Sequence, residues 1–166
     1  MIDNGTKLAR LLLADDHAAM LGQTIRHLEG EFEIVGTVST GLDLVRVASQ
    51  LDPDVMVLDI TMPGLDGIQS AVQLHQAGCR AKLVFLSVHE DPDYLRAALE
   101  AGGAAYVTKT RLASDLIPAI HAVLAGQSFV SPTFAEGDEL STKQRHDHFR
   151  PRKTQAQPNQ TKDKHI

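Results

Sequence analysis

Five polar side chains stand at the carboxyl ends of four short apolar runs. Asp15 and Asp16 follow the run LLLA, Asp59 ends VMVLD, Ser87 closes LVFLS, and Lys109 closes AYVTK. Carboxylate oxygens suit Mg²⁺, a hydroxyl can donate a hydrogen bond, and an ammonium group offsets negative charge. A carboxylate can also accept a phosphoryl group to give an aspartyl phosphate. The five residue types therefore predict a metal site in which Asp59 carries a phosphoryl group, provided that the fold brings them together.

The alternation of predicted strands and helices indicates a fold that brings these five side chains together. The strands are expected at 9–14, 33–38, 55–59, 82–87 and 105–109, and the helices at 18–29, 42–50, 67–77, 92–101 and 112–125. This alternation is typical of βα units and a parallel sheet. In a doubly wound α/β sheet of order 2-1-3-4-5, the first and third strands are neighbours at the switch point, where ligands bind. Asp15, Asp16 and Asp59 are therefore expected at one edge of a five-stranded sheet with five helices.

Turn and capping residues agree with these boundaries. Asp91-Pro92 has the pattern of an N-cap followed by proline at the first helical position, and Thr40 or Ser39 can cap the second helix. Glycines fall where four helices should end, at Gly30, Gly78, Gly102 and Gly126.

Composition limits the class of protein. The chain has 166 residues, 43% of them apolar, with one cysteine, Cys79. A single cysteine excludes an intramolecular disulfide and fits a reducing compartment. The first residues are polar, and no apolar run approaches the roughly 20 residues of a membrane span. A cytoplasmic protein without a membrane anchor is therefore expected.

The charge is divided unevenly along the chain. Residues 1–140 carry 9 basic and 19 acidic residues, whereas residues 141–166 carry 7 basic and 2 acidic ones. An acidic body argues against nucleic-acid binding through the main domain, because phosphate backbones attract basic surfaces. The basic segment has few apolar residues and is expected to be disordered. Whether it binds anything is left open.

With these residues in place, the chain resembles the receiver domain of two-component response regulators over about residues 8–126. Asp15-Asp16 match the acidic pair of that family, Asp59 its phosphoacceptor, Ser87 its hydroxyl position and Lys109 its lysine. The stretch Met62–Gly67 resembles the turn that follows the phosphoacceptor. The resemblance implies a flavodoxin-like (CheY-like) fold.

The resemblance also implies how the site works. Mg²⁺ would be held by Asp16, Asp59 and the backbone carbonyl of Thr61, with Asp15 acting through water. A sensor histidine kinase would supply the phosphoryl group from a phosphohistidine. The protein would be a phosphoacceptor that slowly dephosphorylates itself, not a dedicated enzyme. Tyr106 and Ser87 would form the conformational switch, and the alternative for Tyr106 is a rim tyrosine with its hydroxyl in water.

The end of the domain resembles the NarL/FixJ-type subfamily. Residues 116–132 are similar to the stretch that leads into a helix-turn-helix output domain, and Leu140–Arg145 resembles the opening of that domain. The next residues, His146, Asp147 and His148, lack the apolar side chains that its first helix needs. The sequence interpretation is a receiver at 8–128 and a basic tail at 129–166, with the output domain missing.

Other functions remain open at this stage. A haloacid-dehalogenase-type phosphatase also has an aspartate after an apolar strand, but it needs a second aspartate where this chain has Thr61. A DNA-binding regulator that acts through the tail or a partner subunit is a second alternative, and a binding module independent of phosphorylation is a third. The stand-alone receiver would act through contacts with an unknown protein target, and homodimer formation is undecided.

Overall fold

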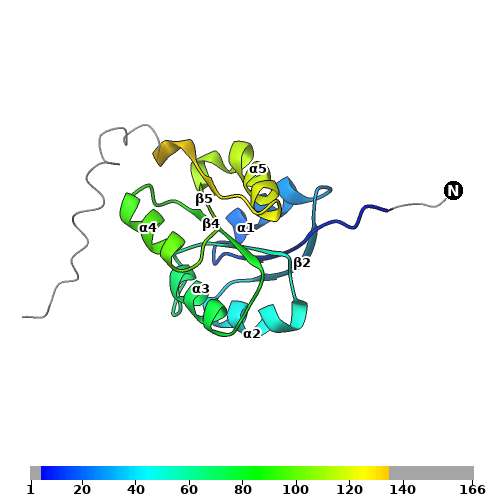
Figure 1. The fold of residues 1–166 in the computed structure, drawn as a ribbon, viewed down its shortest axis with the longest axis horizontal. Coiled ribbons are helices and arrows are strands. Elements are labelled where there is room, and N and C mark those ends of the chain that lie inside the picture. The colour runs from blue at the N-terminus through cyan, green and yellow to red at the C-terminus, as the bar shows by residue number, and fades with distance from the viewer. Residues whose placement is uncertain (1–4, 135–166) are drawn as a thin grey trace, which may run out of the picture.

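The computed structural model describes residues 5–134, in which strands and helices alternate along the chain (Figure 1). The strands form one parallel sheet in the order β2-β1-β3-β4-β5-β6. Their bounds are β1 Arg10–Ala14, β2 Glu33–Val38, β3 Val55–Leu58, β4 Lys82–Ser87, β5 Ala105–Thr108 and β6 Phe129–Val130. The α-helices are α1 Ala18–Leu28, α2 Gly41–Leu51, α3 Gly67–Gln76, α4 Pro92–Glu100 and α5 Leu112–Leu124. Two short 3₁₀ helices are η1 Lys109–Arg111 and η2 Pro132–Phe134.

The parallel sheet and the order of its first five strands are as predicted, and each predicted strand or helix ends within one residue of the observed one. The prediction of five strands is wrong, because β6 adds a sixth beside β5. Phe129 pairs with Ala105 and Val130 with Tyr106. Two residues are too few to show the alternation by which a strand is recognised in a sequence.

Hydrogen bonds hold the segment after α5 against β5. The Ser131 backbone N–H donates to the Tyr106 carbonyl at 2.9 Å. The Ser131 hydroxyl donates to Asp115 of α5 at 2.8 Å and accepts from the Thr108 N–H at 3.1 Å. Phe134 then packs edge-on against the Tyr106 ring, with ring centroids 5.3 Å apart. The structure thus packs residues 129–134 on the sheet, while the predicted domain division at residue 128 stays a prediction.

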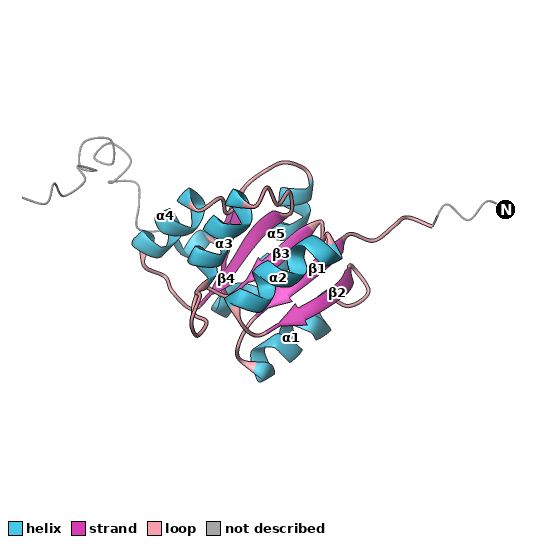
Figure 2. Cartoon of the chain, turned by 90° about the horizontal axis from the view of Figure 1, so that it is seen from below, coloured by secondary structure: helices cyan, strands magenta, loops and turns pink. Residues whose placement is uncertain are grey.

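Helices cover both faces of the sheet, α1 and α5 on one side and α2, α3 and α4 on the other (Figures 1 and 2). Alternate residues of each strand point to opposite faces, so every strand contributes to two cores. In β1, Leu11 and Leu13 pack under α1 and α5, whereas Leu12 and Ala14 pack under the other layer. Strands buried on both faces explain why the sequence shows continuous apolar runs.

Capping residues fix where the helices begin. They therefore also fix where the loops at the carboxyl edge of the sheet end. Thr40 accepts a hydrogen bond from the Asp43 N–H, which confirms it as the cap of α2. Asp66 and Gln69 form a reciprocal capping box at the start of α3. Asp91 caps α4 ahead of Pro92, as predicted. The four predicted C-terminal glycines all have positive φ: Gly30, Gly78, Gly102 and Gly126.

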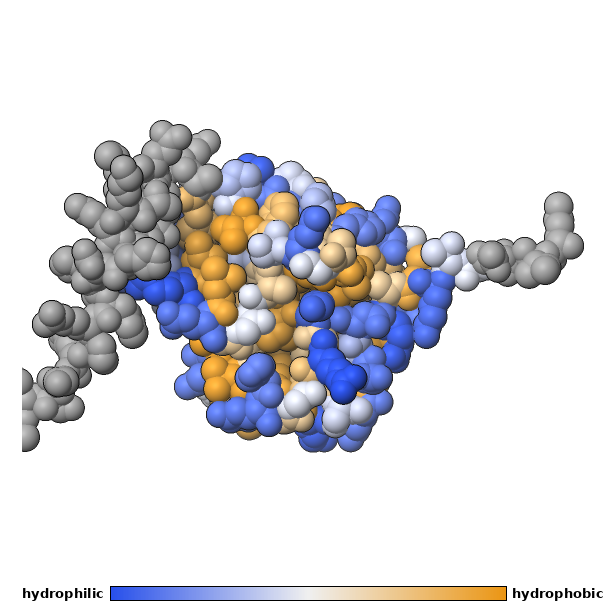
Figure 3. Space-filling view, viewed as in Figure 1, coloured by the Kyte–Doolittle hydropathy of each residue, from blue (hydrophilic) through white to orange (hydrophobic). Residues whose placement is uncertain are grey.

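Among residues 5–134, no helix combines the length and the apolar character needed to cross a membrane. The face seen in Figure 3 carries hydrophobic patches set among hydrophilic ones. The predicted tail at 129–166 is therefore described only up to residue 134, and its remainder, with the stretch Leu140–Arg145 that resembles the opening of an output domain, lies outside the described part of the chain.

Candidate functional site

Two carboxylates meet at the carboxyl edge of the sheet because β1 and β3 are neighbours in register. Ala14 pairs with Leu58, and the Asp59 N–H donates to the Ala14 carbonyl at 2.9 Å. The next residues, Asp15 and Asp59, therefore leave their strands side by side. Both are almost completely buried, with 5% and 3% of their surface exposed. The predicted convergence of strand ends is thus observed for this pair.

Lys109 lies between the two carboxylates. Its Nζ is 3.1 Å from Asp15 Oδ2 and 3.0 Å from Asp59 Oδ2, and its side chain is buried with theirs. The residue follows β5, two strands away from β3, and its long stem spans that distance. Two carboxylates share one ammonium group here, so the trio carries a net negative charge when all three groups are ionised.

One ammonium group does not neutralise both carboxylates, so the negative charge of Asp59 is only partly compensated. Burial raises the pKa of Asp59, and the hydrogen bond and charge of Lys109 lower it. The neighbouring Asp15 raises it again, the Thr61 N–H lowers it, and the net pKa lies above the ordinary carboxyl value. A bound cation would relieve both the burial penalty and the repulsion between the acids.

The carboxylates form part of a larger group of metal-ligating side chains. Asp15, Asp16, His17 and Asp59 each offer a ligand atom, and these atoms all lie within 4.8 Å of one another. Asp16 is more exposed than the buried pair, with 28% of its side-chain surface accessible. Clustered carboxylate oxygens open to water on one side suit Mg²⁺, which keeps several of its waters. The residues present therefore fit the predicted ion.

The turn after β3 bends back over Asp59. The Thr61 N–H donates to Asp59 Oδ1 at 3.2 Å, and the Gly67 N–H donates to the Ile60 carbonyl at 2.8 Å. A Cβ atom at Gly67 would collide with the Asp59 carbonyl oxygen, so only glycine allows this close approach. Gly64 supplies the positive φ of 75° that the turn needs. The direction of the Thr61 carbonyl, the predicted metal ligand, stays a prediction.

Ser87 ends β4 inside the site region and is fully buried. Its hydroxyl accepts a hydrogen bond from the His89 N–H at 3.1 Å. The His89 ring in turn lies 2.8 Å from the Thr61 hydroxyl and stacks on Tyr94 with centroids 3.9 Å apart. His89 therefore joins the loop after β4 to the loop after β3, both at the carboxyl edge of the sheet.

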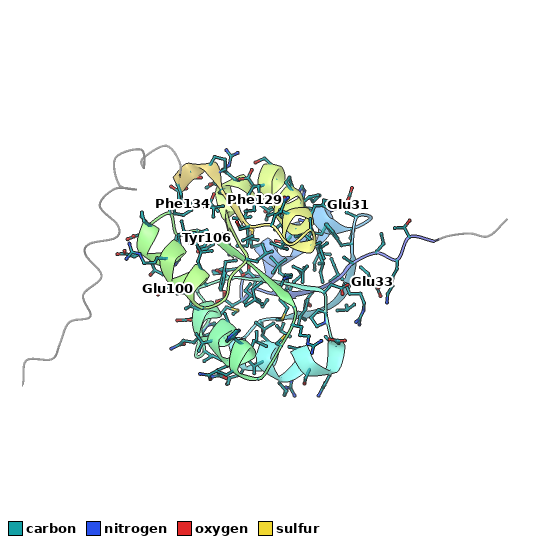
Figure 4. All side chains as sticks on the ribbon, in the orientation of Figure 1. Glu31, Glu33, Glu100, Tyr106, Phe129 and Phe134 are labelled. Carbon is teal, nitrogen blue, oxygen red and sulfur yellow. The ribbon has the colours of Figure 1, made fainter. Side chains whose placement is uncertain are left out.

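Tyr106 is wholly buried, which rules out the alternative of a rim tyrosine with its hydroxyl in water. Its hydroxyl donates to the His89 carbonyl at 2.7 Å, and burial raises the pKa of the phenol. Phe134 lies next to the ring, as Figure 4 shows. Ser87 and Tyr106 thus bind the same residue, His89, through different backbone groups.

The sequence interpretation missed three contributions to this region. His17 was not among the predicted metal ligands, although it directly follows the acidic pair. The bond between Thr61 and His89 joins residues 28 positions apart, and no local signal reveals such a pair. The contact of Phe134 with Tyr106 depends on β6, which the sequence did not predict.

Comparison with known proteins agrees with the site geometry. Residues 11–121 match the family model of the response regulator receiver domain. The chain is 30% identical to the response regulator GacA of Pseudomonas aeruginosa over 147 residues, covering 87% of this chain and 68% of that protein. It is 33% identical to the transcriptional regulatory protein DesR of Bacillus subtilis over 128 residues, covering 76% and 63%. The chain belongs to the response regulator receiver domain family.

Solved structures lead to the same family. A two-component response regulator of the LuxR family from Aurantimonas matches with a TM-score of 0.75 and 30% identity, over 78% of this chain and 94% of that one. The receiver domain of the putative response regulator NarL from Mycobacterium tuberculosis matches with a TM-score of 0.69 and 26% identity, over 73% and 99%. The chain spans about three fifths to two thirds of the length of the curated relatives it matches.

Proposed function

We propose that this chain is the phosphoacceptor of a two-component phosphorelay and that Asp59 takes the phosphoryl group. The observation that carries the proposal is the buried Asp59 carboxylate, which shares Lys109 with Asp15 at the switch point of the sheet. It lies at the carboxyl edge of the sheet, directly after β3, in the same cluster of ligand atoms as the more exposed Asp16. A cytoplasmic location, facing a sensor histidine kinase, belongs to this proposal.

The transfer forms one bond and breaks another. A carboxylate oxygen of Asp59 attacks the phosphorus of a phosphohistidine, and the P–N bond breaks as the new P–O bond forms. The partner's imidazole leaves and takes up a proton. A Mg²⁺ ion bound by Asp16 and Asp59, with Asp15 acting through water, would neutralise charge on the phosphoryl oxygens. Lys109, whose Nζ lies 3.0 Å from Asp59 Oδ2, would offset the remaining charge, and this chain need not transfer a proton.

The conformational response to phosphorylation would follow from the contacts that Ser87 and Tyr106 both make with His89. A phosphoryl group adds a charge of about −1.5 to −2 and acceptor oxygens that attract the Ser87 hydroxyl. Ser87 now accepts from the His89 N–H, and Tyr106 donates to the His89 carbonyl. When Ser87 turns to the phosphoryl group, the loop around His89 must rearrange, and the balance between two loop conformations shifts. The proposed output is an altered protein-binding surface around α4 and β5.

DNA binding is the second candidate, because DesR is named as a transcriptional regulatory protein. The acidic balance of residues 1–140 disfavours contact with a phosphate backbone through the receiver itself. The segment that would carry such binding, and the prediction of a stand-alone receiver, both rest on residues outside the described part. Homodimer formation and the identity of the downstream target stay open in the same way.

Intact-mass measurement with a small acyl-phosphate donor and Mg²⁺ tests the proposal. We expect one added phosphoryl group on the wild type and none on Asp59→Asn or after chelation of the metal. Asp93→Asn is the matched control, because Asp93 is an exposed acid on α4 with 77% of its side chain accessible, and it should behave as the wild type. If no adduct forms, beryllofluoride binding must still be seen. Failure of both would replace the proposal with a binding module independent of phosphorylation.

A further inference from the structure

The buried side chain of Tyr106 joins two segments that are far apart in the sequence. Its hydroxyl donates a hydrogen bond of 2.7 Å to the His89 carbonyl, in the loop after β4. Its ring packs edge-on against Phe134 of η2, with ring centroids 5.3 Å apart (Figure 4). One side chain therefore lies between the loop that responds to the phosphoryl group in the proposed function and the last described residue of the chain.

The start of the segment after α5 is held in a way that does not involve the Tyr106 side chain. Val130 pairs with Tyr106 in the sheet, and the Ser131 N–H donates to the Tyr106 carbonyl at 2.9 Å. The Ser131 hydroxyl bonds to Asp115 at 2.8 Å and to the Thr108 N–H at 3.1 Å. These bonds use the backbone of β5 and a side chain of α5, so a movement of the Tyr106 ring leaves them in place.

The end of the same segment is held by the Tyr106 ring. Phe134 packs on the core layer that contains Tyr106, and its N–H donates to the Ser131 carbonyl at 3.2 Å. The Thr133 hydroxyl lies 3.5 Å from the Thr108 hydroxyl, which is long for a hydrogen bond. The contact between the two rings is therefore the route by which a movement of the Tyr106 side chain would reach η2.

A rearrangement of the loop after β4 would change this ring contact. The acceptor of the Tyr106 hydroxyl, the His89 carbonyl, belongs to the loop that moves when Ser87 turns to the phosphoryl group. A buried hydroxyl that loses its acceptor costs free energy, so the Tyr106 side chain must follow the loop or turn to another acceptor. Either movement alters how its ring packs against Phe134.

We propose that Phe134 is a positioning residue for Tyr106: its ring holds Tyr106 in the unphosphorylated arrangement, and phosphorylation weakens the contact between the two rings. The inference rests on the proposed function and adds a residue to its conformational switch. Coupling between two sites is reciprocal, so removing the Phe134 ring must favour the phosphorylated arrangement. An edge-to-face pair of aromatic rings is strong enough to shift a two-state equilibrium roughly two- to tenfold.

Calorimetric titration of the full chain with beryllofluoride, at saturating Mg²⁺, tests the effect of the ring. We expect Phe134→Ala to bind beryllofluoride roughly two- to tenfold more tightly than the wild type. Phe129→Ala is the matched control, because Phe129 is a partly buried ring of the same segment that packs on the opposite core layer. It should bind as the wild type does. A merely structural role would lower the free energy of unfolding in both variants and change the affinity in neither.

Amide hydrogen exchange, followed by NMR on the wild-type chain, tests the reciprocal effect. We expect beryllofluoride to speed exchange of the Phe134 amide about twofold or more, because its ring contact weakens. The Ser131 amide is the internal reference, since its bond to the Tyr106 carbonyl does not depend on the ring. If exchange at Phe134 is unchanged relative to Ser131, the loop does not act on Phe134 and the inference is overturned.

The wild-type titration separates this inference from the proposed function. If the wild type binds no beryllofluoride in Mg²⁺, the phosphoryl site of the proposed function is wrong and the role of Phe134 falls with it. If the wild type binds beryllofluoride but Phe134→Ala binds it with the same or a lower affinity, the phosphoryl site stands and Phe134 only packs the core. That second result overturns the inference alone.

Discussion

Asp59 and Asp115 are both buried carboxylates beside a cation, yet their pKa values move in opposite directions. Asp59 is 3% exposed and Asp115 is 4% exposed. Burial raises the pKa of Asp115, but hydrogen bonds from Arg111, Ser131 and Ser114 outweigh it, and the net pKa lies below the ordinary value. For Asp59 burial prevails over Lys109, and the net pKa lies above it.

The difference lies in how many donors each carboxylate receives. Asp115 accepts two hydrogen bonds from Arg111, at 2.7 and 3.1 Å, and one each from Ser114 and Ser131, at 2.9 and 2.8 Å. Asp59 shares its ammonium group with a second acid and accepts one backbone N–H. A carboxylate with a full set of hydrogen-bond donors, such as Asp115, stabilises the fold. A buried carboxylate with few donors, such as Asp59, is suited to binding a cation or a phosphoryl group.

Removing the Asp115 carboxylate, which accepts four hydrogen bonds, should have the largest effect on the free energy of unfolding. Asp115→Ala leaves Ser131 and the Arg111 guanidinium without this partner, and we expect the free energy of unfolding to fall by about 3 kcal/mol. Urea unfolding with and without Mg²⁺ measures it, and the loss should be the same in both. The exposed control Asp93→Ala should change stability by less than about 0.5 kcal/mol. A loss that Mg²⁺ restores would contradict the structural role of Asp115.

Removing the shared ammonium group should have a smaller effect that depends on the ion. Lys109→Met leaves Asp15 and Asp59 facing each other, and we expect a loss of about 2 kcal/mol in the presence of a chelator. Saturating Mg²⁺ should recover most of it, because the ion replaces the missing positive charge. Lys82→Met, at an exposed lysine of β4, is the control. If Mg²⁺ recovers nothing, the acids do not share an ion.

At neutral pH, Asp115 and Asp59 should change the free energy of unfolding in opposite directions. The lowered pKa of Asp115 means that its contribution is present above the unfolded value of 3.8 and is lost as the pH falls below it. The raised pKa of Asp59 means that its contribution is present below 3.8 and is lost as the pH rises through the folded pKa. In a chelator, Asp115→Asn should therefore destabilise the protein at pH 6, and Asp59→Asn should stabilise it. The same sign for both variants would contradict the comparison.

The sequence predicts which residues stand at the strand ends of the candidate site, but it does not predict the contacts that make the Asp59 and Asp115 carboxylates differ. The strand ends at Asp59, Ser87 and Lys109 are predictable because apolar runs, caps and glycines mark the βα units. The anchoring of Asp115 is not, because its partner Ser131 follows a two-residue strand without periodicity. The position of the His17 ring depends on a side-chain rotamer, which spacing along the chain does not determine.

The most direct test of the central claim is to find which carboxylate carries the phosphoryl group. After phosphorylation with Mg²⁺, borohydride reduction converts an aspartyl phosphate to homoserine, and peptide mass spectrometry then locates the changed residue. The account predicts homoserine at Asp59 alone, and none when the metal is chelated. Homoserine at Asp15, Asp16 or Asp115, or a modification that does not depend on the metal, would contradict it.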